Sequence, residues 1–472
     1  NGGGIYASGT AKVTLNGASL NDNTATANGG GIYLATGTAL EMQNSSTVNT
    51  NSALNGAGVY AEAGSTLTLT SGSIGNNTAT GNGGGLWTSG IAVISPDFTV
   101  TENRSVNGAG VYAAGPGKVT VDSGRIYSNI ATGNGGGVYL TAGAAFEMLN
   151  SGNIYSNAAV HGGGVYADSG SILTLTSGSL SDNTATGDGG GIWTATDIAL
   201  ATGFSVTGNS TVNGGGVYAS GNAKVTLNGA AISSNTATAD GGGIYLANGT
   251  SLEMLNGSTI SANSAANGAG VYAEAGSTLT LTSGSISNNT ATGDGGGIWT
   301  ATDIALATGF TVNGGGVYAS GSALITIDEG GNIDLNTAVN GGGIYLAGSS
   351  VLAVNGGSIT NNTASSNGGG IYAAAGTTLN LVSGSISDNT ATGTTVDRIS
   401  ITGNRADNGY GGGLYATGPA VVTVYGSITL NSAANGGGIA IVDGAQVTLK
   451  HDAAVNRNQA ASGGGVYVGS SG

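Results

Sequence analysis

Apolar and polar residues alternate in short runs along nearly the whole chain. In residues 268–289, GAGVYAEAG is followed by STLTLTSG and then by SISNN, so Gly, Ser and Asn separate three alternating runs. This pattern predicts three strands and three turns, and no run has the period of a helix. Because side chains alternate between the two faces of a strand, we expect Leu279 and Leu281 to point into a core and Thr278 and Thr280 to point outward.

The same three runs return at a nearly constant step. A glycine motif, Gly-Gly-Gly or Gly-Ala-Gly followed by an aliphatic residue, occurs 18 times, and most copies lie 27 residues apart. A period of this size is typical of solenoids and propellers, but a propeller blade needs about 40 residues and four strands. We therefore predict an all-β fold, a single-stranded right-handed parallel β-helix of about 18 coils with three short strands per coil.

A longer period lies over the first one. Trp87, Trp193 and Trp299 are each 106 residues apart, and the segment WTATDIALATGF occurs unchanged at 193–204 and 299–310, which indicates duplication of a four-coil block. A continuous repeat predicts one solenoid domain, because each coil contacts only its neighbours. The predicted domain is 1–472, with four-coil blocks near 1–106, 107–212 and 213–312.

Two steps break this rhythm. The coil near 295–314 has six residues fewer than its equivalent in the preceding block, and the coil near 393–411 lacks its glycine motif. We expect these losses to shorten a loop or strand locally while the solenoid continues. The chain begins and ends within the repeat, so we also expect it to be a fragment of a longer protein.

Composition narrows the classes of function. Charged residues are 7% of the chain, and 24 acidic residues against 9 basic ones give a formal net charge of -15. No basic stripe is present, so nucleic acid is not an expected partner. The chain has no cysteine, which excludes disulfides and thiolate metal sites, and no apolar run long enough to span a bilayer. We expect no metal and no cofactor, and no helix follows the glycine motif as a phosphate-binding loop would require.

An asparagine precedes most glycine motifs in the pattern aliphatic-x-x-Asn-x-Ala. Asparagines stacked at one position of successive coils can pass amide hydrogen bonds along the solenoid and satisfy buried backbone groups. Some lie in glycosylation sequons, such as Asn76-Asn77-Thr78, so a glycan acceptor is the alternative interpretation. The predicted structural ladder consists of Asn23, Asn51, Asn77, Asn103, Asn129, Asn157, Asn183, Asn209, Asn235, Asn263, Asn289, Asn336, Asn362, Asn389, Asn404, Asn431 and Asn458.

An aromatic residue follows the aliphatic residue of the glycine motif in 17 of 18 copies. Because the aliphatic residue points inward, we expect the aromatic ring to point outward, with rings of successive coils about 5 Å apart. The rings either stabilise the strands as in-register pairs or form a strip that binds glycans or joins solenoids side by side. This candidate binding ladder consists of Tyr6, Tyr33, Tyr60, Trp87, Tyr112, Tyr139, Tyr166, Trp193, Tyr218, Tyr245, Tyr272, Trp299, Tyr318, Tyr345, Tyr372, Tyr415 and Tyr467.

Parallel β-helices include polysaccharide lyases and hydrolases, so the acidic residues are candidates for catalysis. The two carboxylates of a glycosidase lie roughly 5 to 9.5 Å apart, whereas Glu41, Glu147 and Glu253 recur four coils apart. The only histidines, His161 and His451, are far apart in the sequence. We therefore expect no catalytic residues and no enzyme. Ice binding by outward threonines is a minor option, because glutamates interrupt the threonine array.

The paired pattern, aliphatic-x-x-Asn-x-Ala followed by Gly-Gly-(Gly/Ala)-Ile-Tyr, resembles the repeat of the chlamydial polymorphic outer membrane proteins. Related repeats occur in large bacterial surface proteins and in autotransporter passengers. The family's Phe is here Ile, Leu or Val, and its Gly-Gly-Ala is here Gly-Gly-Gly or Gly-Ala-Gly. The resemblance covers essentially the whole chain, and it implies a secreted, surface-displayed rod that often acts as an adhesin.

We therefore expect a non-enzymatic β-helical rod, extracellular or on the cell surface, that serves as a structural stalk or adhesin. Its partners would be glycans or proteins of a host or neighbouring cell, or other copies of itself, end to end or side by side. The alternative is a self-assembling subunit of an extracellular fibre, because the ends carry no evident polar cap of the kind that solenoid termini need. A polysaccharide-binding or polysaccharide-degrading β-helix is a minor alternative.

Overall fold

The computed structural model describes residues 1–367, 369–374, 376–391, 414–416, 421–424, 427–450 and 453–470. These residues form a right-handed parallel β-helix of about 16 turns with three strands per turn and no helix. The predicted fold class is therefore confirmed, with a coil count slightly below the predicted 18. The irregular coil predicted near 393–411 lies outside the described residues.

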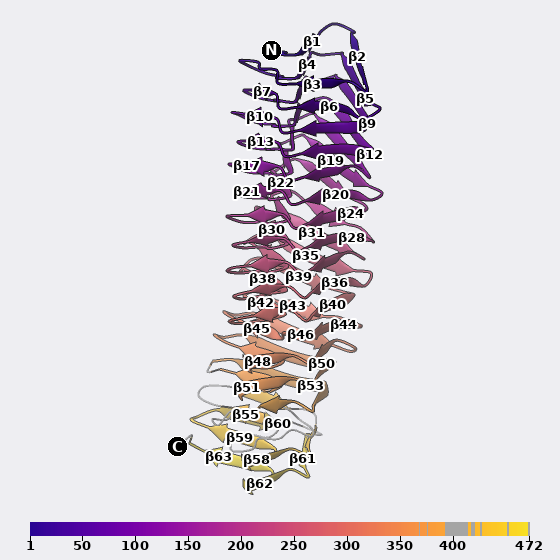
Figure 1. Ribbon diagram of the computed structural model, residues 1–472. Helices are drawn as coiled ribbons and strands as arrows, with labels where there is room; N and C mark the ends of the chain where they lie inside the picture. The colour runs from indigo at the N-terminus through magenta and orange to yellow at the C-terminus, as the bar shows by residue number, and fades with distance from the viewer. Residues whose placement is uncertain are drawn as a thin grey trace. The chain divides into compact units, whose positions relative to one another are not determined.

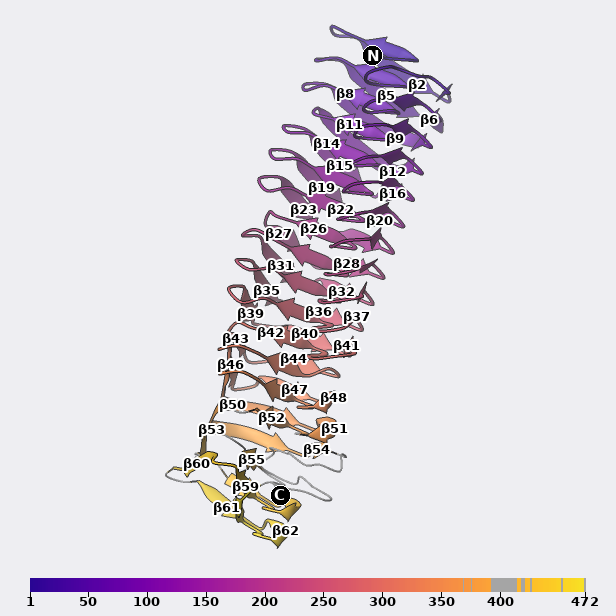
Figure 2. The ribbon, with the colours of Figure 1, turned by 90° about the vertical axis from the view of Figure 1, so that its left-hand side faces the viewer.

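The chain divides into two compact units, and each is built from the same kind of turn. The first unit comprises residues 1–238 and 243–245, and the second comprises residues 239–242 and 246–472. One turn of the first unit contains three main strands, β4 (Ile32–Leu34), β5 (Ala39–Gln43) and β6 (Ser46–Asn49). A two-residue strand, β7 (Ser52–Ala53), follows the third of them. Figures 1 and 2 show the strands of successive turns stacked on one another within each unit.

The strands that follow the glycine motif, which we call motif strands, pair in parallel and in register. Trp87, for example, lies opposite Tyr60 on one side and Tyr112 on the other. In the first unit the order is β1 (Ile5–Ala7), β4, β8 (Val59–Ala61), β11 (Leu86–Thr88), β14 (Val111–Ala113), β18 (Val138–Leu140), β22 (Val165–Ala167), β26 (Ile192–Thr194) and β30 (Val217–Ala219). In the second unit it is β38 (Val271–Ala273), β42 (Ile298–Thr300), β45 (Val317–Ala319), β49 (Ile344–Leu346) and β52 (Ile371–Ala373), with β55 (Leu414–Ala416), β59 (Ile439–Val442) and β63 (Val466–Gly469) in a separate sheet.

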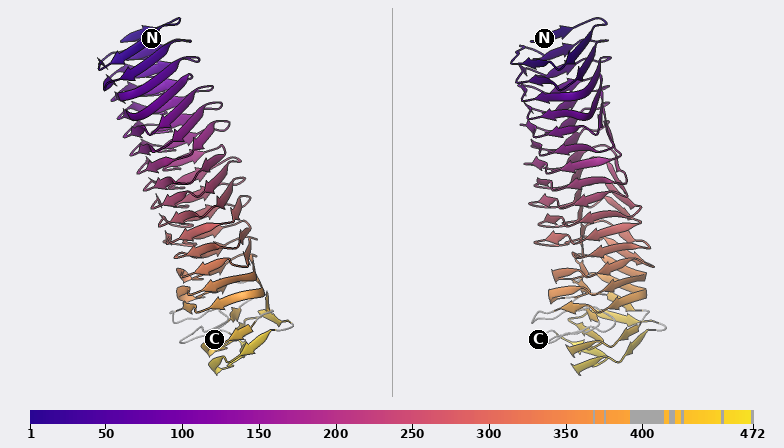
Figure 3. Two further views of the ribbon diagram at one scale, coloured as in Figure 1. Left: turned by 90° about the vertical axis from the view of Figure 1, so that its right-hand side faces the viewer. Right: turned by 45° about the vertical axis from the view of Figure 1, so that its right-hand side comes forward.

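The second and third strands of each turn also pair with the same strands of the next turn. β5 lies between β2 (Lys12–Asn16) and β9 (Thr66–Gly75), and β9 runs through both strand positions without a break. β12 (Ile91–Thr101), β50 (Val351–Thr360) and β53 (Thr378–Ser387) are continuous in the same way. Figure 3 shows these parallel arrows from two further directions.

A short strand follows the ladder asparagine in most turns, and these short strands form sheets of their own. In the first unit they are β7, β10 (Thr78–Ala79), β13 (Arg104–Ser105), β17 (Ile130–Ala131), β21 (Ala158–Ala159), β25 (Thr184–Ala185), β29 (Ser210–Thr211) and β33 (Thr236–Ala237). In the second unit β37 (Ser264–Ala265) pairs with β41 (Thr290–Ala291). A separate sheet of the second unit consists of β48 (Thr337–Asn340), β51 (Thr363–Asn367) and β54 (Thr390–Ala391).

The core is a column of aliphatic side chains inside each unit. Leu279 is 5% exposed and Leu281 is 1% exposed, whereas Thr278 and Thr280 are exposed, as the alternation predicts. All four phenylalanines are also buried inside the turns, at Phe98, Phe146, Phe204 and Phe310. Burying an aliphatic side chain contributes roughly 1.5 to 3 kcal/mol, so each turn adds a similar increment of stability.

The glycines of the motif have two different structural roles. The first glycine has a positive φ, for example 69° at Gly29, which L side chains avoid. The third glycine leaves no room for a side chain. A Cβ placed on Gly85 would lie 2.7 Å from the carbonyl oxygen of Gly110 and 2.8 Å from the Asn103 amide nitrogen. Every copy of the motif has glycine at this third position.

A Gly85→Ala substitution tests this packing constraint. We expect it to lower the free energy of unfolding by about 1–3 kcal/mol, because backbone of the next turn must move to admit the methyl group. Gly203→Asn is the matched control, since Gly203 has a φ of 85° but no atom within 4 Å of its added Cβ, and Asn tolerates this conformation. Thermal unfolding followed by circular dichroism would measure both. Equal melting temperatures for the two variants would contradict the assignment.

Candidate functional site

The buried asparagines form a continuous hydrogen-bonded ladder inside the first unit. The backbone N–H and the side-chain Nδ2 of Asn77 both donate to Oδ1 of Asn103, each at 3.0 Å. Nδ2 of Asn77 also donates to the carbonyl oxygen of Val48 at 2.9 Å. Each amide thus connects three turns and satisfies a backbone donor and a backbone acceptor at a point where the chain bends out of the third strand.

The first unit places its predicted ladder residues on one line, from Asn23 to Asn235. In the second unit the described ladder bonds join Asn263 to Asn289, Asn336 to Asn362 to Asn389, and Asn431 to Asn458. Asn404 lies outside the described residues. The ladder residues between the ends are at most 2% exposed, so their amide nitrogens do not face solvent.

In the part of the chain that the structure describes, the residue before each ladder asparagine from Asn23 onward has a left-handed backbone conformation. Thr50, Ala262 and Leu335 have φ of 53°, 55° and 55°. A left-handed conformation costs a non-glycine residue roughly 1–2 kcal/mol, so the surrounding hydrogen bonds must hold it in place. This bend turns the next side chain, the asparagine, inward. Asn, Asp and Ser each recur at this position, for example at Asn76 and Asp182. Because Asn and Asp are enriched in this conformation, the sequence carries a partial signal for the bend.

The predicted aromatic ladder forms a stack of nearly parallel rings on the motif strands. Centroids of Tyr6 and Tyr33 are 5.1 Å apart with an interplanar angle of 4°, and those of Tyr60 and Trp87 are 4.2 Å apart at 6°. In the first unit the described contacts run from Tyr6 to Tyr245, and in the second unit from Tyr272 to Tyr372. Tyr467 packs against Ala440 and Val442, and the side chain of Tyr415 lies outside the description.

The rings are less exposed than a single outward side chain would be. Tyr33 is only 6% exposed and Tyr245 is 9% exposed, while Tyr60 and Trp87 are half-buried. Each inner ring has both faces covered by the rings above and below it, so solvent meets mainly ring edges and hydroxyl groups. A ligand at this surface would therefore contact edges and hydroxyls rather than stack on an open ring face.

Two carboxylates bind hydroxyl groups of the aromatic ladder. The hydroxyl group of Tyr33 donates to Glu62 Oε1, and that of Tyr139 donates to Asp168 Oδ2 at 2.8 Å. Glu62 and Asp168 are 106 residues apart, as are the two tyrosines. Neither pair was predicted, although an acidic residue two positions after an aromatic one recurs at the 106-residue period and is a signal for them.

Burial and these carboxylates shift the pKa values of the tyrosines. Burial raises the pKa of Tyr166 to about 12, and the charge of Asp168 adds to the effect. The pKa of Tyr33 is raised chiefly by burial and further by its hydrogen bond to Glu62. The same hydrogen bond is the main reason that the pKa of Glu62 is lowered.

A second polar column, not predicted as a ladder, lies immediately before the glycine motifs. Asn107 Nδ2 donates to Asn82 Oδ1 at 3.0 Å, and Asn213 Nδ2 donates to Asp188 Oδ1 at 2.9 Å. His161 occupies the same column, where its Nδ1 accepts the backbone N–H of Asp188 at 3.0 Å. His161 thus substitutes for an asparagine oxygen, and His451 lies outside the described residues.

The recurring glutamates lie on the outer face of the second strands. Lys12 Nζ lies 2.7 Å from Glu41 Oε2, and Lys118 Nζ lies 3.0 Å from Glu147 Oε2. Threonines lie opposite Glu41 on both neighbouring strands. Across the part of the chain that the structure describes, no group of three or more His, Asp or Glu side chains is placed to hold a metal ion.

Comparison with known proteins gives one family. A family model described as a right handed beta helix region matches residues 147–306 and 307–471, which is more than half of the chain. The match does not test the narrower resemblance to the chlamydial proteins. Neither the curated proteins nor the solved structures give a match. None of the described residues forms a helix long and apolar enough to cross a membrane.

An Asn103→Ala substitution would show what the ladder contributes. It removes the acceptor of two Asn77 donors and the donor to the Ile74 carbonyl, so we expect a loss of about 3 kcal/mol or more in unfolding free energy. Asn107→Ala, four residues away in the half-buried second column, is the control and should cost about 1 kcal/mol. Denaturant titration of both variants measures the two losses of unfolding free energy. Similar losses would mean that a ladder asparagine contributes no more to stability than an asparagine of the second column.

The raised tyrosine pKa values predict loss of stability in alkali. An unfolded tyrosine ionises near pH 10, whereas the folded Tyr166 keeps its proton to about pH 12. The contribution of such tyrosines is complete below pH 10 and disappears as the pH rises through about 12. Phenolate absorbance and circular dichroism should therefore change together above pH 10. Asp168→Asn should shift ionisation to lower pH, and ionisation near pH 10 without loss of structure would disprove the prediction.

Proposed function

Because the chain belongs to the family of right-handed β-helix proteins, we propose that it is a non-enzymatic structural rod that acts outside the cell as a stalk or adhesin. Right-handed β-helix proteins include both enzymes and non-enzymes, so the proposal depends on the side chains of this chain. Its main support is that the interior ladder repeats one kind of side chain, an asparagine amide that binds other asparagine amides.

Catalysis requires several reactive polar groups to converge on one substrate. The interior ladder of each unit contains only asparagine amides, and these are hydrogen-bonded to one another. The outer glutamates Glu41 and Glu147 have lysine partners rather than a second carboxylate. This arrangement favours a scaffold over an active site, because a repeat distributes its chemistry along the chain instead of concentrating it.

The aromatic ladder is the surface that we propose for adhesion. Ring edges and hydroxyl groups recur once per turn, at centroid spacings such as 5.0 Å between Tyr112 and Tyr139. A regular array of weak contacts gains affinity for a multivalent surface without any single strong site. Glycans or proteins with repeated polar groups, on a host or neighbouring cell, are the partners that such an array would suit.

Replacing Tyr60, Trp87 and Tyr112 together by serine tests this surface. We expect binding to cells or to immobilised glycans to fall at least about tenfold, since several aromatic contacts are lost at once. The matched control is Tyr127→Ser with Tyr155→Ser, because these rings also stack, 4.8 Å apart, but on the third strands β16 (Arg125–Tyr127) and β20 (Gly152–Tyr155).

Three results would contradict the proposal. Unchanged binding by the triple variant would exclude the ladder as the adhesive surface. Turnover of an acidic polysaccharide that Glu147→Gln abolishes would establish an enzyme. Growth of filaments in light scattering and electron microscopy would instead favour the fibre subunit.

A further inference from the structure

Two duplicated coils differ by one deletion, which leaves one coil of the second unit incomplete. The segment WTATDIALATGF is identical at 193–204 and at 299–310. It continues as SVTGNSTVNGGGVYAS after Phe204 but as TVNGGGVYAS after Phe310. The six residues TGNSTV are therefore absent from the second copy, and the first copy shows the structure that they would form.

In the complete copy, the third strand β28 (Phe204–Thr207) leads to the ladder residue Asn209 and then to the short strand β29. In the shortened copy, β44 (Phe310–Asn313) pairs as β28 does, with Asn313 opposite Ser287, but the next three glycines lead directly into motif strand β45. The N–H groups of Gly315 and Gly316 donate to Asn336 Oδ1 at 2.8 and 2.6 Å. Two backbone donors thus replace the missing asparagine, and the motif strands continue across this coil while one short strand is lost.

The lost strand leaves a gap between β41 and β48. Ala265 and Ala364, at the equivalent position of complete turns in this unit, are 6% and 0% exposed. Ala291 and Ala338, which border the gap, are partly exposed, and Val339 is 64% exposed. A cavity of about 370 Å³ lies here, lined by Ala291, Gly314, Ala338 and Val339 among others.

Both sides of the gap present backbone groups without partners. In a complete turn, the Ser210 N–H donates to the Asn183 carbonyl and the Thr238 N–H donates to the Thr211 carbonyl. Among the described residues, the equivalent Asn289 carbonyl has no hydrogen-bond partner, and neither does the Thr337 N–H, whose counterpart Thr236 N–H donates to the carbonyl of a ladder asparagine in the complete turn. Two sheet edges therefore face each other across the space of one absent strand, and an edge of this kind is a template for another chain.

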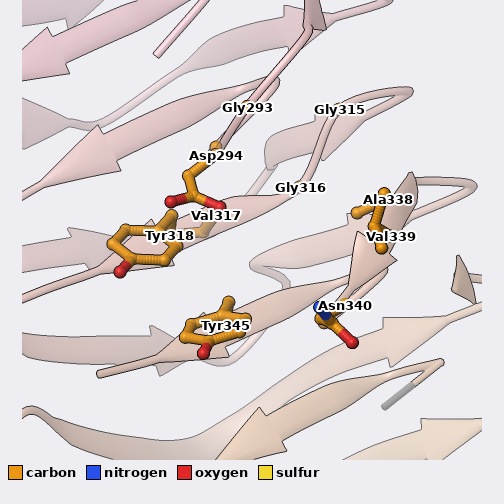
Figure 4. Close-up of a pocket in the computed structure, with 12 residues that line it drawn as sticks. Gly293, Asp294, Gly315, Gly316, Val317, Tyr318, Ala338, Val339, Asn340 and Tyr345 are labelled. Atoms are coloured by element: carbon orange, nitrogen blue, oxygen red, sulfur yellow. The ribbon is translucent and has the colours of Figure 1, made fainter. Parts of the chain in front are cut away.

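At one end of the gap, the carboxylate of Asp294 is an acceptor for a side-chain hydrogen bond. In the complete copy, Asn213 Nδ2 donates to the equivalent carboxylate, Asp188 Oδ1, at 2.9 Å. The Asp294 carboxylate lacks such a partner within the described residues, and burial raises its pKa. Figure 4 shows Asp294 in the adjoining hollow with Gly316, Ala338 and Asn340, which come from the turns that border the gap.

We propose that this gap binds an extended segment of another polypeptide as an added β-strand. The occupant is a segment of the type Ser-Thr-Val-Asn, as in 210–213 of the complete copy. Its main chain donates to the Asn289 carbonyl and accepts the Thr337 N–H, which is recognition by strand addition. Its second side chain must be small, because it replaces Thr211, which is 6% exposed. Its asparagine amide donates to Asp294. This proposal does not depend on the adhesive role of the aromatic ladder.

The probe is a fluorescent peptide with the sequence TGNSTVN, residues 207–213, titrated into the full chain. We expect saturable binding at one site per chain. The matched variant carries TGNSTV inserted between Val312 and Asn313, which restores the complete coil and fills the gap. Affinity for this variant should be at least about tenfold weaker. Asp294→Ala, which leaves the gap open, should weaken binding by a smaller factor because only the amide contact is lost.

Absence of saturable binding to the native chain would overturn the proposal, and so would equal binding to the variant with the restored coil. Circular dichroism of that variant shows whether it is folded, and the Asp294→Ala variant provides a test even where the insertion disturbs folding. If the native chain dimerises in sedimentation and the restored chain does not, the occupant is a second copy of this chain, and the proposed partner is wrong.

Discussion

The buried asparagine ladder is the interaction on which the rest of the structure depends. In each turn the chain buries backbone groups at the bend beside the ladder asparagine, and an unsatisfied buried group costs roughly 1–3 kcal/mol. The amide of Asn103 accepts two hydrogen bonds from Asn77 and donates to the Ile74 carbonyl. Each amide must meet another amide at the equivalent position of the next turn. The ladder therefore fixes the register of the turns and the direction of every strand that leaves the bend.

The glycine motif and the left-handed bend follow from the same constraint. The third glycine lies beside the ladder amide, where a Cβ on Gly85 would be 2.8 Å from Asn103 Nδ2. The residue before the asparagine has a strained conformation, as at Leu335 with φ of 55°, which the ladder hydrogen bonds stabilise. The aromatic stack on the motif strand is in register because those strands are in register, so ring spacings such as 5.1 Å reflect the ladder inside the turn.

The sequence predicts the repeated features well, because periodicity reveals them. The three strands per turn, the inward Leu279 and Leu281, and the positions of the asparagines and aromatic residues all follow from a 27-residue step and the alternation of a strand. The features that it does not predict lie between turns. The Tyr139–Asp168 hydrogen bond joins residues 29 positions apart, and the near burial of Tyr33 arises from neighbouring rings rather than from its own strand. The left-handed residue is only partly visible in the sequence, because Asn and Asp, which favour this conformation, share the position with Ser, Thr, Ala and Leu.

A solenoid also determines what a deletion can do. In a globular domain, loss of six residues next to the core would disturb contacts with distant segments, whereas each turn here contacts only adjacent turns. The shortened coil keeps its second and third strands, and the backbone N–H groups of Gly315 and Gly316 take over the ladder bond to Asn336. The part that is lost is the short strand that follows the ladder asparagine. A repeat can therefore acquire a local gap with unpaired edges while its interior remains continuous, and a site for one partner strand can arise by deletion rather than by insertion of new residues.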